Sequence, residues 1–231
     1  MDLLSSKPEK PWQSYQPLFK PSYCVYPKDN DTESLNSQCK EFLNLVENKN
    51  TKETDIKRFI QTNNYIHIPA SLFKLYNFGH HDAYVIKEFK LGTNYIADYL
   101  LIGKSSDGYQ FVFVECESVY GRIVLDDGNF GESIRKGINQ INDWKSYIES
   151  NWSTINSELM KYSLPNINFP KEFYNYDSTR IRYLVISGRR IDYTDTLRQR
   201  ARRSERDDNI TIKHYDNWYD MAIIEINSDT Y

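Results

Sequence analysis

The sequence has no long apolar run: no stretch of its 231 residues approaches membrane-spanning length, and the residues after Met1 contain no apolar signal core. Cysteine is scarce as well, because only Cys24, Cys39 and Cys116 occur, an odd number without metal-type spacing. These absences argue against a membrane protein and a disulfide-stabilised secreted protein. We expect a soluble cytoplasmic protein with reduced thiols.

A strong charge of either sign is also lacking, since the formal net charge is only −3. The overall charge therefore does not by itself indicate nucleic-acid binding. Two local biases stand out: prolines gather near the start of the chain, and residues 188–206 are dense in arginine. The prolines argue against regular helix, so we predict a proline-rich N-terminal arm over residues 1–33 and one domain over 34–231.

Hydrophobic periodicity within this domain predicts two helices, then a three-stranded meander, then helices alternating with strands. Such alternation indicates an α/β fold with a central mixed sheet. Asn50 and Glu53 resemble a capping pair at the start of the second helix, although Glu53 could instead approach the acidic residues described next. We expect helices near 35–48, 51–63, 133–150, 152–162, 194–206 and 216–227, and strands near 84–89, 96–102, 111–117, 181–187 and 210–213.

Two consecutive apolar strands carry acidic residues near their ends, Asp98 on one and Glu115 and Glu117 on the other. Residues 103–108 read as the turn of a β-hairpin between them. Glu115 and Glu117 are two apart and so share a strand face, and buried carboxylates are costly unless paired. Three such oxygen donors favour Mg²⁺ or Mn²⁺; the alternative is strand-end carboxylates that reach solvent or pair with arginine.

This order of elements resembles the PD-(D/E)XK nuclease superfamily, and more specifically the C-terminal nuclease domain of Shedu antiphage-defence proteins. Asp98 and the segment 115–117 stand where the D…E-x-K motif is expected, with Ala97 in place of the motif proline. Residues 137–144, 186–190 and 214–216 extend the resemblance. It implies a restriction-endonuclease-like fold, a central mixed β-sheet flanked by helices, and metal-dependent cleavage of DNA in phage defence.

The chain departs from this pattern at Glu117, which replaces the motif lysine that stabilises charge during phosphodiester cleavage. Three outcomes remain open. Glu117 could be an extra ligand in a two-metal site; Lys136, one helical turn before Gln140, could supply the charge; or the site could be inactive. Gln140 begins a segment similar to a Q-x-x-x-Y element, which implies that it orients a phosphate or the nucleophile.

Arginines at two places are candidates for binding DNA phosphates. Arg189 and Arg190 follow the strand at 181–187, and Arg198 and Arg202 lie on the arginine-rich helix. The alternatives are a salt bridge from the first pair to Asp192 or Asp195, and a solvated face or subunit interface for the helix.

We therefore expect a Mg²⁺- or Mn²⁺-dependent endodeoxyribonuclease that assembles as a homo-oligomer. Asp98, Glu115 and Glu117 would hold metal, while Lys136 and Gln140 would complete the catalytic site. A non-catalytic nucleic-acid-binding or assembly module with the same fold is the main alternative. A protein-binding scaffold, acting through the arm and the arginine-rich helix, is a third.

Overall fold

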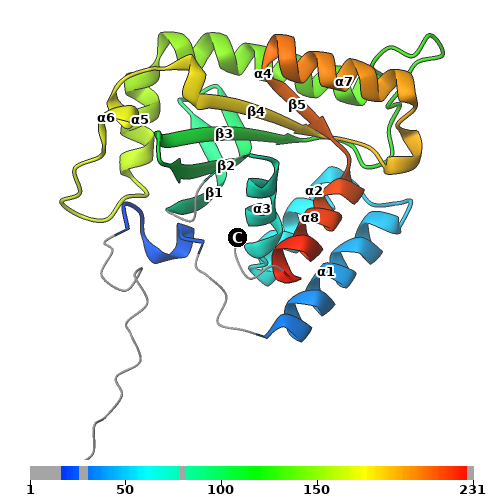
Figure 1. Cartoon of the computed structure of the whole chain (residues 1–231), viewed down its shortest axis with the longest axis horizontal. Coiled ribbons are helices and arrows are strands. Elements are labelled where there is room, and N and C mark those ends of the chain that lie inside the picture. The colour runs from blue at the N-terminus through cyan, green and yellow to red at the C-terminus, as the bar shows by residue number, and fades with distance from the viewer. Residues whose placement is uncertain (1–16, 26–30, 77, 79–81, 228–231) are drawn as a thin grey trace, which may run out of the picture.

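The computed structural model describes residues 17–25, 31–76, 78 and 82–227, which form a five-stranded mixed sheet with helices on both faces (Figure 1). The strand order is β1-β2-β3-β4-β5, antiparallel from β1 to β3 and parallel from β3 to β5. This confirms the predicted α/β class and the restriction-endonuclease-like arrangement. The strands are β1 (Ala83–Leu91), β2 (Tyr95–Ser105), β3 (Gly108–Cys116), β4 (Ile181–Ile186) and β5 (Ile210–Lys213).

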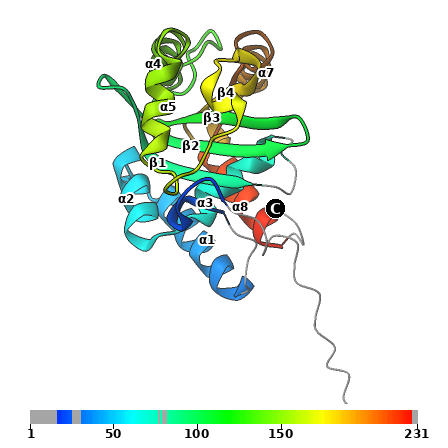
Figure 2. The ribbon, with the colours of Figure 1, turned by 90° about the vertical axis from the view of Figure 1, so that its left-hand side faces the viewer.

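The helices cover the sheet in two layers, seen end-on in Figure 2. One layer contains α4, α5, α6 and α7, and the other contains α1, α2, α3 and α8. Their bounds are α1 (Thr32–Glu47), α2 (Glu53–Asn63), α3 (His67–Ala70), α4 (Glu132–Ser150), α5 (Trp152–Met160), α6 (Lys171–Tyr174), α7 (Asp195–Asp208) and α8 (Tyr215–Asn227), with short 3₁₀ turns at Pro21–Tyr23, Ser71–Leu75, Ser178–Arg180 and Arg190–Asp192.

The β2–β3 hairpin is tighter than the sequence indicates. Pairing continues from Tyr99↔Val114 out to Ser105↔Gly108, so the loop is only two residues long. Gly108 has a φ of +103°, which glycine adopts without strain. Neither loop residue, Ser106 or Asp107, has a positive φ, so the left-handed step of the turn falls on Gly108. The longer hairpin fixes the register that brings the acidic residues together.

The side chains of successive β3 residues pack on opposite faces of the sheet. Phe111 and Phe113 pack towards α4, whereas Val112 and Val114 pack towards α1, α2 and α8. This period of two places Glu115 in phase with Phe113, on the α4 side of the sheet. Cys116 packs in the opposite layer.

Helix α4 lies very close to the sheet at Gly137. A Cβ atom there would lie 2.8 Å from Val185 Cγ1 and 3.2 Å from Glu117 Cγ. A residue without a side chain is therefore what permits the close packing at this point. The contact also brings the first turns of α4 beside Glu117.

Some local features differ from the predictions. The cap of α2 is not the pair Asn50 and Glu53; the backbone N–H of Lys52 donates to Asp55 instead, at 3.0 Å. Helix α3 and the 3₁₀ turn after it occupy a stretch expected to be irregular. Both elements are too short to show a hydrophobic period, which explains why the sequence pattern did not reveal them.

The described part of the N-terminal arm packs on the domain. Leu18 and Phe19 are buried in the core that includes α4 and α5, and the ring of Phe19 lies 4.8 Å from that of Tyr84. Residues 1–16 and 26–30 of the predicted arm lie outside the described residues. Helix α1 begins at Thr32, just before the predicted boundary at residue 33. Among the described helices, none is both long and apolar enough to span a membrane.

Candidate active site

Asp98 lies where the pairing of β2 with β3 ends. The last backbone pair is Tyr99↔Val114, and the next donor on β3, the N–H of Cys116, donates to Asp98 Oδ2 at 2.8 Å. The carboxylate therefore takes the place of a strand acceptor. On the other side, the register with β1 is interrupted opposite Asp98, where Glu88 has a φ of +51°. As predicted, Asp98 and Glu115 lie on neighbouring antiparallel strands.

Helix α2 brings a second carboxylate and a lysine to Asp98. Lys57 Nζ lies 2.8 Å from Asp98 Oδ1 and 2.6 Å from Glu53 Oε1. Glu53 and Lys57 are one turn apart on the helix, so both face the same way. Of the two roles open to Glu53, the structure supports the approach to the acidic centre. Sequence reasoning missed Lys57, whose only local signal is its spacing from Glu53.

Helix α4 supplies the other lysine. Lys136 Nζ lies 2.8 Å from Glu117 Oε2, although the Lys136 side chain is 62% exposed and that of Glu117 only 3%. The backbone of Glu117 is fixed by its N–H bond to Ile186 and by the hydroxyl of Tyr215, which donates to its carbonyl oxygen. Lys136 thus reaches the acidic residues from α4, as its spacing from Gln140 indicates.

Two carboxylate oxygens in this cluster are buried without a hydrogen-bond donor in the described structure. They are Oε2 of Glu115 and Oε1 of Glu117. A buried charged oxygen without a partner is strongly disfavoured. Both atoms are therefore suited to accept a cation or, in its absence, a proton.

The charges of the cluster do not balance, because within the described residues ion pairs bring two ammonium groups, those of Lys57 and Lys136, to four acids: Glu53, Asp98, Glu115 and Glu117. Burial, together with the negative charges of the other three acids, raises the pKa of Glu115 to about 9. Burial also raises the pKa of Asp98 and that of Glu117, and the neighbouring lysines limit both rises. At neutral pH and without a further cation, Glu115 holds a proton.

A divalent cation would fit this donor set. Within the described residues, no three acidic, His or Cys side chains are already gathered as a metal site holds them, and the acids bind the two lysines instead. The two unpartnered oxygens and the excess of carboxylates are nevertheless the chemistry that hard cations such as Mg²⁺ and Mn²⁺ prefer.

A hollow of ≈550 Å³ lies between α4 and the β1–β2 turn, and it adjoins the cluster through Lys136, which binds Glu117. Lys136 and Gln140 lie in its wall, so the structure brings Gln140 beside the lysine that binds Glu117. The remaining lining residues are Asn94, Tyr95, Ile96 and Asp143.

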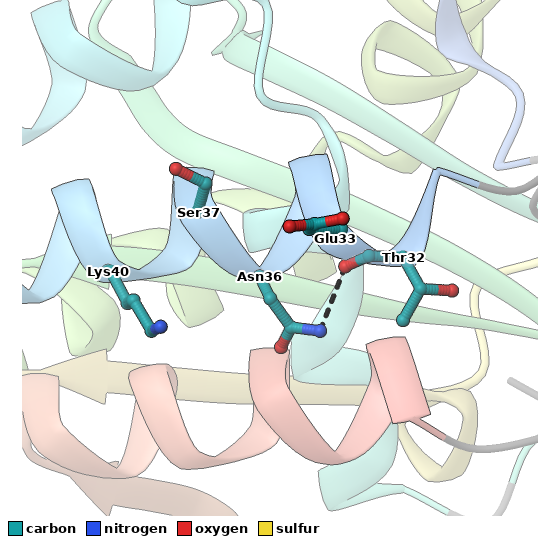
Figure 3. Close-up of a pocket in the computed structure, with 5 residues that line it drawn as sticks. All are labelled: Thr32, Glu33, Asn36, Ser37 and Lys40. Carbon is teal, nitrogen blue, oxygen red and sulfur yellow. Dashed lines mark hydrogen bonds between the residues drawn. The ribbon is translucent and has the colours of Figure 1, made fainter.

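A second hollow, of ≈640 Å³, lies along the first half of α1 (Figure 3). In it, the side-chain amide of Asn36 donates to the carbonyl oxygen of Thr32. Its lining contains no buried ionisable group, so it lacks the chemistry of the acidic cluster. The lining residues are Thr32, Glu33, Asn36, Ser37 and Lys40.

Arg189 is held by several contacts within the protein, and its role as a phosphate contact stays a prediction. Its guanidinium binds both carboxylate oxygens of Asp216, at 2.9 and 3.0 Å, and donates to the carbonyl oxygen of Val46 and the hydroxyl of Tyr120. The Arg189 side chain thus forms its salt bridge with Asp216, and not with Asp192 or Asp195, the two acids suggested by the sequence. Because these partners occupy Arg189 Nε, Nη1 and Nη2, the side chain ties β4, α8 and α1 together.

The other three arginines are more accessible. Arg190 pairs with Asp220 and remains half exposed; Arg198 lies 6.0 Å from the ring centroid of Tyr193; and Arg202 is exposed on α7. Helix α7 is less basic than its arginines suggest, because its five arginines are offset by four acidic residues.

Comparison with known proteins gives one family. The family model described as the C-terminal part of Shedu protein SduA matches residues 50–219, a span that contains all the acids and lysines of the cluster. No curated protein matches the chain. The match covers well over half of the 231 residues, and the chain therefore belongs to the Shedu SduA C-terminal family.

Proposed function

We propose that this protein is a divalent-metal-dependent DNA nuclease that acts in antiphage defence. Membership of the Shedu SduA C-terminal family supports a role in defence. The acidic cluster at the ends of β2 and β3 supports hydrolysis of a phosphodiester. The observation that carries the proposal is the pair of buried, unpartnered oxygens on Glu115 and Glu117.

Asp98, Glu115 and Glu117 are the residues that would hold Mg²⁺ or Mn²⁺. When bound there, the metal would lower the pKa of a bound water and neutralise charge on the phosphate. Cleavage adds one water across a P–O bond of the DNA backbone and yields a phosphate monoester and an alcohol. A proton resides on Glu115 in the metal-free centre, so loading the site releases it.

Other residues of the chain would position the substrate. Lys136 and Gln140 face the hollow beside the carboxylates, where they can bind and orient a phosphate group. Arg190, Arg198 and Arg202 offer guanidinium groups to phosphates farther along the strand. Arg189 is a weaker candidate than these three, because its guanidinium already donates to Asp216 and Tyr120.

A non-catalytic nucleic-acid-binding or assembly module is the second candidate. The ion pairs of Lys57 with Asp98 and of Lys136 with Glu117 favour it, because they neutralise two of the expected ligands without metal. A centre kept in this state would preserve the fold and lack turnover.

Cleavage assays separate the two functions. Wild-type protein is incubated with linear, nicked and covalently closed DNA in Mg²⁺, Mn²⁺ or chelator. A nuclease converts DNA only with metal, and Glu115→Gln or Asp98→Asn abolishes cleavage while DNA affinity is retained. Glu149→Gln, an exposed acid on α4, is the matched control and should cleave normally. DNA binding by the wild type without cleavage under any metal would favour the non-catalytic module.

A further inference from the structure

Glu117 stands where the family motif has a lysine, so this position offers no positive charge to stabilise the phosphate during cleavage. Two lysines contact the acidic cluster, Lys57 from α2 and Lys136 from α4, and they enter from different elements. The geometry points to Lys57 as the catalytic cation of this centre. This inference rests on the proposed nuclease function.

Lys57 is the more firmly positioned of the two. Its ammonium group is held by Glu53 on its own helix and by Asp98 on β2, and Asp98 is itself fixed by the backbone N–H of Cys116. Lys136 has a single carboxylate partner, and its side chain is 62% exposed against 28% for Lys57. A charge stabilises a transition state most effectively when it is already in place and shielded from water.

The ammonium group also retains a donor for substrate. Lysine carries three N–H groups, and Glu53 and Asp98 use two of those of Lys57. The partial exposure of the side chain leaves it open on one side, so the third N–H can donate to a non-bridging phosphate oxygen.

Lys57 acts through its charge and not through proton transfer. Its ammonium group lies between the carboxylates of Glu53 and Asp98, at 2.6 and 2.8 Å, a position that suits a fixed cation. Water supplies both the oxygen that bonds to phosphorus and the proton that ends on the leaving oxygen.

A charge-stabilising role and a merely structural one have opposite consequences for metal binding. Removing Lys57 takes away a positive charge 2.8 Å from Asp98, so a divalent ion should bind more tightly. Turnover should nevertheless fall, because the developing negative charge on the phosphate loses its cation. A scaffold residue would lower metal affinity and turnover together.

The test compares Lys57→Met, Lys57→Arg and Arg58→Met in the full chain. Arg58 is the next residue of α2, is exposed and pairs only with Asp55 among the described residues, so Arg58→Met controls for loss of one positive charge from this helix. Turnover is measured with Mg²⁺, and binding of Mn²⁺ without DNA is measured by titration calorimetry. Thermal melts with Mn²⁺ verify folding.

We expect Lys57→Met to lower turnover on the order of 10²–10³-fold while the affinity for Mn²⁺ rises. Lys57→Arg should recover part of the turnover, and Arg58→Met should match the wild type. The inference is overturned if the wild type cleaves and Lys57→Met remains within about tenfold of it, or if Lys57→Met loses Mn²⁺ affinity and turnover together while Lys57→Arg restores neither. A wild type that fails to cleave in any metal would overturn the proposed function itself.

Discussion

The side chains of the acidic cluster carry an excess of negative charge, and most of them are buried. Glu115 and Glu117 are 5% and 2% exposed, and each has an oxygen without a donor among the described residues. Among the described residues, the positive charges of Lys57 and Lys136 can neutralise two of the four acids. The cluster is therefore costly for the folded protein unless a proton or a cation joins it, which is the energetic signature of a binding site.

The protonation of Glu115 makes a prediction for metal-free protein. Its folded pKa, about 9, lies above the unfolded value of about 4.3. The folded state therefore binds the extra proton, and the stability that this proton contributes is lost as the pH rises between these two values. In chelator at pH 8, Glu115→Gln should be more stable than the wild type, on the order of 1 kcal/mol or more.

Thermal or urea unfolding across pH 4 to 9 measures this effect. The advantage of Glu115→Gln should shrink towards pH 4, and the exposed control Glu149→Gln should show no comparable trend. An advantage that stays constant with pH would show that Glu115 is not the protonated acid.

Arg189 makes a second prediction, concerning its bonds to Asp216, Val46 and Tyr120. Arg189→Ala should lower the free energy of unfolding by about 3 kcal/mol, because Asp216 loses the guanidinium group while largely covered and keeps the backbone N–H of Arg190. Arg190→Ala removes a more exposed pair with Asp220 and should cost no more than about 1 kcal/mol. Urea unfolding measures both. Reduced DNA affinity with unchanged stability in Arg189→Ala would restore its role as a phosphate contact.

At the scale of helices and strands, the sequence pattern is informative wherever an element is long enough to show a period. Helix α4 begins within one residue of its predicted start at 133, and β5 matches its predicted range. Short elements escape this reasoning: α3 has four residues, and the cap of α2 uses Lys52 and Asp55, two positions further along the chain than the predicted pair. Local propensity cannot decide between such close alternatives.

The contact of α4 with the sheet gives an element-scale prediction. Gly137→Ala adds a methyl group 2.8 Å from Val185 and 3.2 Å from Glu117. Overpacking of about 1–3 kcal/mol should exceed the gain of about 1 kcal/mol in helix propensity, so the variant should be less stable. Asn139→Ala, at an exposed position of the same helix, should be neutral or stabilising. Calorimetric melts that show Gly137→Ala to be stabilised would contradict the close packing.

The described part of the N-terminal arm gives a further prediction at this scale. Phe19 is fully buried and packs against Tyr84, Phe169 and Phe173. Phe19→Ala should cost about 3–5 kcal/mol, the usual range for truncating a buried aromatic residue, whereas the exposed neighbour Ser22→Ala should cost little. Urea unfolding tests this. Equal stability of the two variants would mean that the arm is dispensable for the fold.

At the scale of the whole molecule, the candidate site is assembled by contacts between elements that are distant in sequence. Asp98 and Glu115 could be placed together from the hairpin, and Lys136 from the helix that follows. Lys57 could not, because its contact with Asp98 joins residues 41 positions apart and depends on how α2 docks against the sheet. The pairing of Arg189 with Asp216 spans 27 positions and was missed for the same reason.

The most direct measurement is the anomalous diffraction of crystals of the protein soaked in Mn²⁺. If the cluster is a divalent-metal centre, a strong peak should lie among the carboxylates of Asp98, Glu115 and Glu117, and it should vanish in Glu115→Gln crystals. The Lys136 side chain, held by one exposed ion pair, should move away from Glu117 when metal binds. A well-diffracting, Mn²⁺-soaked crystal with no peak at these carboxylates, and with both lysines still paired to them, would contradict a metal-dependent centre.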